Sequence, residues 1–376
     1  MSLLNVRTPA LILDRVVLER NLDRMAARAA RLGVALRPHV KTHKCVEVAA
    51  LQKERGAHGF TVSTLPEAEA MFAAGFDDLT WALPLSPQAI DPALDLGRRG
   101  TLRLLVDDAA TFGALETAAG TRGARPHAWL KVDCGYHRAG VDPASPEALE
   151  LAGRMASSRG IVFDGLLTHA GHSYYAYERA RRLAIAEQER DVMVGFAARL
   201  RAAGHQVPGI SIGSTPTLSI VEDLAGVSEA RPGNYAFLDL AQVGLGVCGV
   251  EEIAISILAT VVSHPPGAER AVIDAGALAL SKDHGPEQGE WSGTMGAVCP
   301  DPAATVPDAA LRLASISQEH GVIRPSRPGG LRGRLPVGAR VRVLPNHSCL
   351  ATACFDRLHV LEGDRVTGSW TIHRGR

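Results

Sequence analysis

Short runs of β-branched and aromatic residues alternate with longer amphipathic stretches over the first two thirds of the chain. The stretches 16–33, 66–75 and 179–204 carry apolar residues at helical spacing, and each ends in Gly, a frequent helix C-terminal residue. Other runs predict eight strands, which begin at Val34, Gly59, Leu79, Leu102, His127, Ile161, Gly209 and Tyr235. Eight strands alternating with helices favour a closed (β/α)8 barrel. An open doubly wound sheet is the alternative, although no GxGxxG follows the first strand.

The pattern changes after about Gly246, where long helical stretches give way to strands and hairpin turns. The segments ISILATVVS, ERAVIDAG, ARVRVLP and LHVLEGDRVTGSWTIH alternate as strands do, and Glu362-Gly363-Asp364 is a hairpin turn. We therefore expect a barrel domain over residues 8–245 and a β-rich domain over 246–376, which residues 1–7 join.

The composition is that of a globular protein acting on small molecules. Of the 376 residues, 46% are hydrophobic, while 40 Lys and Arg balance 40 Asp and Glu. Balanced charge argues against nucleic acid or an anionic membrane as partner. We found no secretory signal, and the apolar run from Ala254 is too short to cross a bilayer. Six cysteines without regular pairing favour a cytoplasmic protein with reduced thiols.

The stretch RPHVKTHK, from Arg37 to Lys44, is the first with candidate chemistry. As a strand it would place His39, Lys41 and His43 on one face. A Lys at the C-terminal end of a barrel strand is a candidate for Schiff-base chemistry. A solvated basic strand end is the competing interpretation, and the pattern alone leaves both open.

Glycine-containing turns offer an anion site of the kind that a phosphorylated cofactor needs. GSTPT presents Gly213, Ser214 and Thr215 after a strand, and RPGNY presents Gly233 and Asn234. Two further polar residues, Arg138 and His169, also follow predicted strands. Barrel active sites lie at that end of the strands, so these features are expected on one face.

LPNHSCLATACFD, near the C-terminus, carries His347 and Cys349 two positions apart. On a strand these side chains share a face and can reach one ion. An imidazole and a thiolate suit Zn²⁺, with the remaining positions open to substrate and water. A buried structural cysteine is the ordinary alternative.

Together these motifs resemble the fold-type III pyridoxal-phosphate enzymes, of which alanine racemase is the type case. TPALILD, RPHVKTHK, VDCGYHRAGV, GSTPT and RPGNY match in order across nearly the whole chain. THAGHSY, DAGALALSKD, SQEHG and PNHSC resemble the eukaryotic-type D-serine dehydratase and D-threonine aldolase branch. The resemblance implies an alanine racemase-like (β/α)8 barrel with a C-terminal β-rich domain that carries the metal ligands. It also implies a homodimer.

The resemblance assigns a role to each matching residue. Lys41 is expected to bind pyridoxal 5'-phosphate as a Schiff base, His169 to lie against its ring, and Arg138 to lie near its phenolic oxygen. Arg231 resembles the arginine that faces the pyridine nitrogen. His347 and Cys349 match the metal ligands. The residues expected around the phosphate are Gly213, Ser214, Thr215, Gly233 and Asn234, and Tyr235 is also expected to bind the cofactor.

The implied activity is a pyridoxal-phosphate- and zinc-dependent dehydratase that converts a β-hydroxy D-amino acid, D-serine first, to a keto acid and ammonia. Freed Lys41 is the expected base for the α-proton, and Tyr174 is a candidate for positioning substrate. Glu319 and His320 are candidates for support of the metal ligands. A D-threo-3-hydroxyaspartate dehydratase and a D-threonine aldolase are the alternatives. In the aldolases an Asp takes the second ligand position, so Cys349 favours zinc and dehydration. A metal-free racemase and a non-catalytic cofactor-binding protein are less consistent with the motifs.

Overall fold

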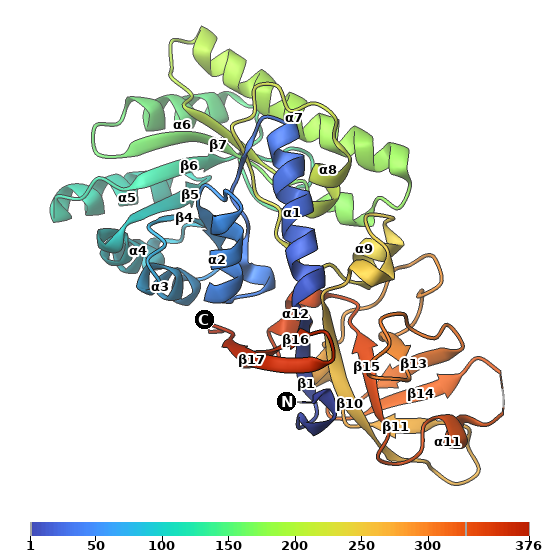
Figure 1. Cartoon of the computed structure of the whole chain (residues 1–376). Coiled ribbons are helices and arrows are strands. Elements are labelled where there is room, and N and C mark those ends of the chain that lie inside the picture. Colours follow the sequence, from blue (N-terminus) through green and yellow to red (C-terminus); the bar gives the residue numbers. More distant parts are fainter. Residues whose placement is uncertain (1, 328, 376) are drawn as a thin grey trace. The chain divides into compact units, whose positions relative to one another are not determined.

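The computed structural model describes residues 2–327 and 329–375, which form two compact units (Figure 1). The barrel unit comprises Arg24–Lys41 and Val48–Gly233. The β unit comprises Thr42–Glu47, Asn234–Arg374 and the N-terminal segment up to Asp23. The domain limits expected from the sequence, 8–245 and 246–376, remain a prediction.

The barrel unit is built on eight parallel strands in the order β2-β9-β8-β7-β6-β5-β4-β3. A parallel bridge between His39 and Thr61 joins the two ends of this order, so the ring closes between β2 and β3. The predicted parallel α/β barrel is thereby confirmed. The strands are β2 Ala35–Leu36, β3 Phe60–Val62, β4 Asp78–Pro84, β5 Thr101–Val106, β6 His127–Lys131, β7 Val162–Leu167, β8 Gly209–Ile212 and β9 Glu229–Ala230.

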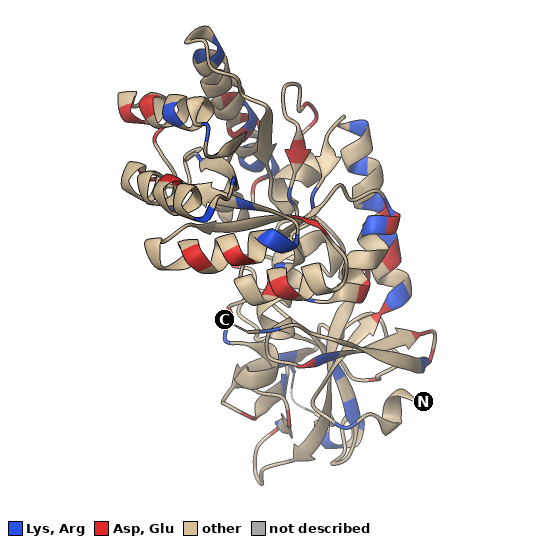
Figure 2. Ribbon diagram, turned by 90° about the vertical axis from the view of Figure 1, so that its left-hand side faces the viewer, with Lys and Arg blue, Asp and Glu red and all other residues tan. Residues whose placement is uncertain are grey.

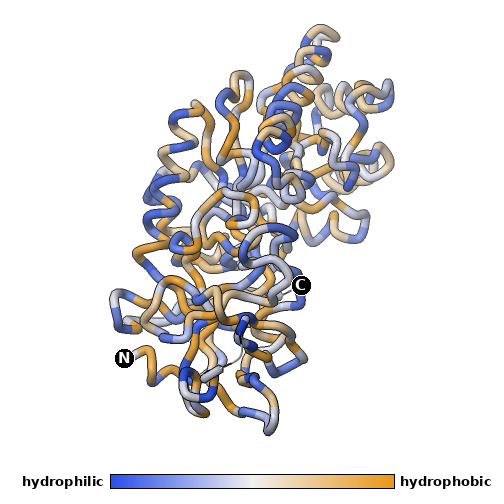
Figure 3. The backbone as a smooth tube through the Cα atoms, turned by 90° about the vertical axis from the view of Figure 1, so that its right-hand side faces the viewer, coloured by the Kyte–Doolittle hydropathy of each residue, from blue (hydrophilic) through white to orange (hydrophobic). Residues whose placement is uncertain are grey.

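The helices of the barrel unit follow from local sequence signals. Thr64, Asp108 and Ser145 accept hydrogen bonds from backbone N–H groups in the first turns of α3, α5 and α6. Figure 2 shows acidic and basic residues on the helices, and Figure 3 shows hydrophilic and hydrophobic residues alternating along the chain. The helices are α3 Leu65–Ala73, α4 Ile90–Leu96, α5 Ala109–Arg122, α6 Pro146–Ser157, α7 Arg179–Ala202 and α8 Thr215–Ile220, together with α1 Arg15–Arg31 and α2 Val46–Glu54, whose first residues belong to the β unit. Within the described residues, none of the helices is long and apolar enough to span a membrane.

The eighth strand does not lie where the sequence predicted it. The run from Tyr235 forms the 3-10 turn Asn234–Ala236 and then α9 Leu240–Gly244. Leu238 adopts a positive φ of 55° and Asp239 caps α9, so the run cannot continue as a strand. The eighth strand is instead β9, whose two residues are too few to produce a periodic pattern.

The β unit carries a nine-stranded sheet in the order β11-β14-β13-β12-β15-β10-β1-β16-β17. Strand β1 is antiparallel to β10 and parallel to β16, and Gly363 turns the predicted β16–β17 hairpin at φ +62°. The strands are β1 Ala10–Asp14, β10 Ile255–Ser263, β11 Ala271–Ile273, β12 Ala297–Cys299, β13 Leu311–Ile316, β14 Gly321–Pro325, β15 Arg340–Leu344, β16 Arg357–Glu362 and β17 Arg365–Thr371. Among the described residues, the short helices of this unit are α9, α10 Ala277–Leu280, α11 Leu331–Arg334 and α12 Ser348–Thr352.

A buried arginine, Arg37, forms ion pairs with Asp78 of β4 and Glu229 of β9 near the closure between β2 and β3. Arg37 is 1% exposed and donates to Glu229 Oε2 at 2.7 Å and to Asp78 Oδ1 at 2.6 Å. Burial alone would lower the pKa of Arg37, but Glu229 and Asp78 raise it; burial would raise the pKa of Asp78, but Arg37 and Arg103 lower it. A Cβ at Gly59 would lie 2.3 Å from Arg37 Nη1, so only glycine leaves room for the guanidinium.

Candidate active site

Lys41 does not lie on a strand, contrary to the sequence-based prediction. Strand β2 ends at Leu36, and Val40–Thr42 form a 3-10 turn, so His39, Lys41 and His43 do not share a strand face. The backbone is drawn toward β3 because Thr61 N donates to Pro38 O at 2.8 Å. Lys41 itself is half-buried and lies near the C-terminal end of β2, where a barrel active site is expected.

His169 follows β7, and the barrel unit holds it as a neutral imidazole. Its Nδ1 lies 2.9 Å from Gly213 O, so Nδ1–H is the donor and the proton-free nitrogen is Nε2. Burial, and next the Lys41 cation, hold the pKa of His169 well below its usual value. A neutral, fixed ring is suitable for packing against a flat aromatic cofactor.

Arg138, Tyr136 and His172 form a stacked group beside His169. The Arg138 guanidinium lies 5.1 Å from the centre of the Tyr136 ring, and His172 stacks on that ring at 5.8 Å. Arg138 is exposed, so its charge faces solvent and is accessible to an anionic ligand. Tyr174 is half-buried in the next 3-10 turn, Gly171–Tyr175. Its role in positioning substrate remains a prediction.

The GSTPT turn is rigid and can only be made with glycine at position 213. Gly213 has φ +122°, and a Cβ there would lie 2.9 Å from Arg231 N. Ser214 caps α8 through a hydrogen-bonded box with Thr217. Thr215 is buried at the first position of this helix. The turn lies at a helix N-terminus that follows a strand, and its predicted contact with a phosphate group remains a prediction.

A buried carboxylate, Glu189 of α7, holds this turn, and the sequence analysis missed it. Its Oε1 accepts from Ala170 N at 2.9 Å and from Gly213 N at 3.1 Å, and its Oε2 accepts from Thr217 Oγ1 at 3.1 Å. Burial raises the pKa of Glu189. The carboxylate therefore fixes both the segment after His169 and the turn at Gly213.

Arg231 and Asn234 both belong to the RPGNY motif, but the Arg231 side chain forms hydrogen bonds within the barrel unit and the Asn234 side chain within the β unit. The Arg231 guanidinium is buried and donates to Ser211 Oγ and Thr168 O. Burial lowers its pKa to about 10, so it stays cationic at neutral pH. The Asn234 side-chain amide belongs to the β unit and donates to Asp239 Oδ2 at 2.6 Å and Ser348 Oγ at 3.0 Å. Any phosphate contact from Gly233, Asn234 or Tyr235 remains a prediction.

His347 and Cys349 approach each other, but on a helix start and not on a strand. His347 is the N-cap residue of α12, and Cys349 lies in its first turn. The two side chains are hydrogen-bonded, and His347 Nδ1 also lies 2.5 Å from Asp283 Oδ2. Burial alone would lower the pKa of His347, but Cys349 and Asp283 raise it to about 11. An imidazole and a thiol in contact fit a divalent metal ion.

Three residues that the sequence analysis did not select support this pair within the β unit. Thr42 Oγ1 lies 3.2 Å from Cys349 Sγ. Asp239 Oδ2 accepts from Ser348 N at 2.9 Å and thereby fixes the backbone between the two ligands. Asp283, which contacts His347, ends the DAGALALSKD motif, so a signal for it was present.

His347 and Cys349 are the two residues expected to hold a metal ion, and this role remains a prediction. Over residues 2–327 and 329–375, no group of three or more His, Cys, Asp and Glu side chains has the geometry of a metal site. Two ligands leave several coordination positions for substrate and water. Glu319 and His320 are exposed between β13 and β14, and their predicted role beside the ligands remains untested.

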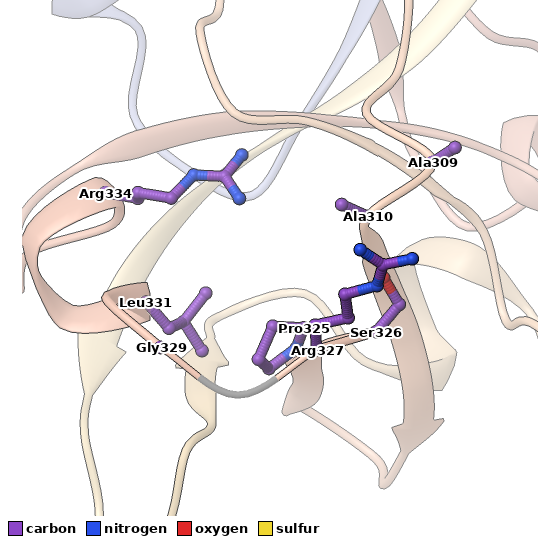
Figure 4. Close-up of a pocket in the computed structure, with 8 residues that line it drawn as sticks. All are labelled: Ala309, Ala310, Pro325, Ser326, Arg327, Gly329, Leu331 and Arg334. Carbon is purple, nitrogen blue, oxygen red and sulfur yellow. The ribbon is translucent and has the colours of Figure 1, made fainter.

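A pocket of about 500 Å³ opens elsewhere in the β unit (Figure 4). Its lining includes Arg327 and Arg334, and Arg334 is already paired with Asp308. None of the residues predicted for cofactor, substrate or metal lines this pocket. We therefore assign it no part in the candidate chemistry.

Comparison with known families covers nearly the whole chain. Residues 13–240 match the family described as alanine racemase, N-terminal domain, and residues 254–361 match the putative serine dehydratase domain. The chain is 40% identical to D-threo-3-hydroxyaspartate dehydratase of Delftia sp. strain HT23, over 98% of both chains. It is 34% identical to D-serine dehydratase of Dictyostelium discoideum, over 96% of this chain and 94% of that one. It is 30% identical to D-threonine aldolase of an Arthrobacter species, over 98% and 93% of the two chains.

A solved structure supports the same relationship. A metal-free cysteine-to-alanine variant of D-threo-3-hydroxyaspartate dehydratase superposes with a TM-score of 0.96 at 39% identity, over 100% of both chains. Sequence and fold thus agree along the full length. The chain belongs to the alanine racemase-like family of fold-type III pyridoxal-phosphate enzymes, in the branch that carries a serine dehydratase domain.

Proposed function

We propose that this protein is a pyridoxal-phosphate- and metal-dependent lyase that removes water from a β-hydroxy D-amino acid and releases a keto acid and ammonia. The observation that carries the proposal is the hydrogen-bonded pair His347 and Cys349, an imidazole–thiol ligand set. A cysteine at position 349 favours a borderline-soft ion such as Zn²⁺. D-Serine and D-threo-3-hydroxyaspartate are the two substrates, since the chain is 34% and 40% identical to dehydratases named for them.

The cofactor, when bound, withdraws electrons from the substrate's α-carbon, and the metal ion polarises the β-hydroxyl as a Lewis acid. Lys41 would hold the cofactor and, once released from it, accept the α-proton on Nζ. His169 would support the ring through Nε2 or its face, while Nδ1–H stays on Gly213 O. Gly213, Ser214 and Thr215 would hold the phosphate, and Arg138 would supply an accessible positive charge.

The chain itself links the lysine to the metal ligands. Thr42 follows Lys41 directly, and the Thr42 hydroxyl lies 3.2 Å from Cys349 Sγ. A hydroxyl that donates to a thiolate stabilises the deprotonated form, which is the form that binds a metal. Thr42, which is bonded to the proposed base Lys41, would therefore stabilise the thiolate form of the proposed ligand Cys349.

Keto acid formation tests the proposal. Purified protein supplied with pyridoxal phosphate and zinc is expected to release pyruvate from D-serine or oxaloacetate from D-threo-3-hydroxyaspartate. A chelator should stop release while the visible absorbance of the cofactor persists. Glycine and an aldehyde as products would replace the proposal with the aldolase reaction, which the Arthrobacter relative's name supports. Turnover that survives thorough chelation would remove the metal from the mechanism.

Zinc as the native ion, a homodimer and a cytoplasmic location also belong to the proposal. The six cysteines are all free, which supports a reducing compartment. Elemental analysis of the purified protein and its mass in solution test the metal and the assembly directly.

A further inference from the structure

We propose that Asp283 is a positioning residue that fixes the tautomer and orientation of His347 for the metal ion. This inference rests on the metal site of the proposed function and extends it beyond the two ligands. Its basis is the contact between Asp283 Oδ2 and His347 Nδ1, at 2.5 Å. Asp283 and His347 lie 64 residues apart in sequence, so the contact is made by the fold and not by local spacing.

The contact determines which ring nitrogen can bind a metal. A neutral imidazole has one N–H and one lone pair, and a carboxylate can only accept. With Nδ1–H donated to Asp283, the lone pair is on Nε2. A carboxylate that accepts the second N–H of a ligand histidine also raises the basicity of the ligating nitrogen.

Asp283 is itself held in place from both sides. Its backbone N–H donates to Ser281 Oγ at 3.2 Å, and Ser281 has a positive φ of 64°. Its carbonyl accepts from Asn346 Nδ2 at 3.1 Å, and Asn346 also donates to Thr294 O at 2.8 Å. Asn346 directly precedes His347, so the same short segment holds both the Asp283 backbone and the imidazole that Asp283 orients.

This anchoring distinguishes the pair from an ordinary surface contact. The two side chains are 36% and 41% exposed, which for two mobile groups would give a weak ion pair. Here the carboxylate is fixed through its own backbone, and the imidazole is fixed by the start of α12 and by its contact with Cys349. Little conformational entropy is then lost when the hydrogen bond forms.

Metal affinity of the holoenzyme, measured against a competing chelator, tests the role. Asp283→Ala is expected to weaken zinc binding by about 10–100-fold, the usual loss when such a partner is removed. Asp283→Asn should recover part of this loss, because the amide oxygen can still accept Nδ1–H. The visible absorbance of bound pyridoxal phosphate should be the same in all variants, which shows that they are folded.

Asp364→Asn is the matched control, since Asp364 is an exposed carboxylate of the same unit, in the turn between β16 and β17, and should leave zinc affinity unchanged. Unchanged affinity in Asp283→Ala would overturn the proposal. Equal and complete loss of zinc in Asp283→Asn and Cys349→Ala would also overturn it, because Asp283 would then be a direct ligand. Wild-type protein that binds zinc but forms no keto acid would refute the proposed function and leave the role of Asp283 standing.

Discussion

Lys41 is the residue on which the proposed chemistry depends most directly. Lys41→Ala is expected to abolish the Schiff-base absorbance and to lower keto acid formation by about 10²–10⁴-fold or more, because both the anchor and the base are lost. Absorbance spectra and a keto acid assay check this. Lys53→Ala, an exposed lysine of α2, is the control. A Lys41→Ala variant with wild-type absorbance and turnover would show that another amine binds the cofactor.

Thr42, the residue that follows Lys41, is expected to act on the proposed metal ligand Cys349. Thr42→Val keeps the shape but removes the hydroxyl that contacts Cys349, a hydrogen bond worth about 1 kcal/mol. Zinc affinity should therefore fall by about fivefold, as measured by chelator competition. Thr117→Val, an exposed threonine of α5, should change nothing. Equal affinities in all three proteins would mean that the hydroxyl does not act on the thiolate.

Some residues of the candidate site could be predicted from the sequence, and others could not. Lys41, His169 and His347 lie in short motifs whose residue types already suggest their chemistry. Thr42 contacts Cys349 and Asp283 contacts His347 across 307 and 64 residues of sequence, so no local pattern predicts either contact, although Asp283 lies in the quoted motif DAGALALSKD. Glu189 was hidden for another reason, since a glutamate on a charged helix resembles a solvated residue.

At the scale of elements, α7 positions the turn between β8 and α8 through Glu189. Glu189→Gln turns one carboxylate oxygen into a donor that must face a backbone N–H or the Thr217 hydroxyl. The variant should lose about 1–3 kcal/mol of unfolding free energy and bind pyridoxal phosphate more weakly. Denaturant unfolding and a cofactor titration measure the two effects. Glu187→Gln, exposed on the same helix, should match the wild type in both.

The closure between β2 and β3 depends on Arg37. Arg37→Met leaves Asp78 and Glu229 without their buried partner and is expected to cost about 3–5 kcal/mol of unfolding free energy. Arg98→Met, an exposed arginine, should cost little. Because pairing lowers the pKa of Asp78, its stabilisation is complete above the unfolded pKa of about 3.9 and disappears as pH falls through the folded value. The difference between wild type and Arg37→Met should therefore shrink in acid, and a constant difference would contradict this account.

The strand and helix predictions succeeded where a pattern ran over several residues. The long helices and the barrel strands β4 to β8 lie within apolar runs of several residues, whereas β9 has two residues and no such run around it. The run from Tyr235 misled because it is buried, apolar and contains two aromatic residues, as buried turns can also be. The composition of a run indicates whether it is buried. Only backbone signals, such as the helix cap at Asp239, indicate whether the chain continues as a strand or turns into a helix.

For the whole molecule, the alternation of elements was enough to predict a barrel followed by strands. The order of the nine-stranded sheet was not predictable, because β1 pairs with β10 and β16, which lie far along the chain. A TM-score of 0.96 at 39% identity shows that this arrangement is kept when most residues differ. The proposed cofactor residues Lys41 and His169 lie in the barrel unit, and the proposed metal ligands His347 and Cys349 lie in the β unit.

The place of β1 in the sheet has a consequence for biosynthesis. About 240 residues separate β1 from β10, so at about 5–20 residues per second the nascent β1 waits about 12–48 s for its first partner. Every strand of the barrel sheet is synthesised during that interval. The segment ALILD therefore has no partner from its own sheet until β10, at Ile255–Ser263 of the 376 residues, has been synthesised. His347 and Cys349 emerge later still, so metal can be captured only after the lysine segment has long been made.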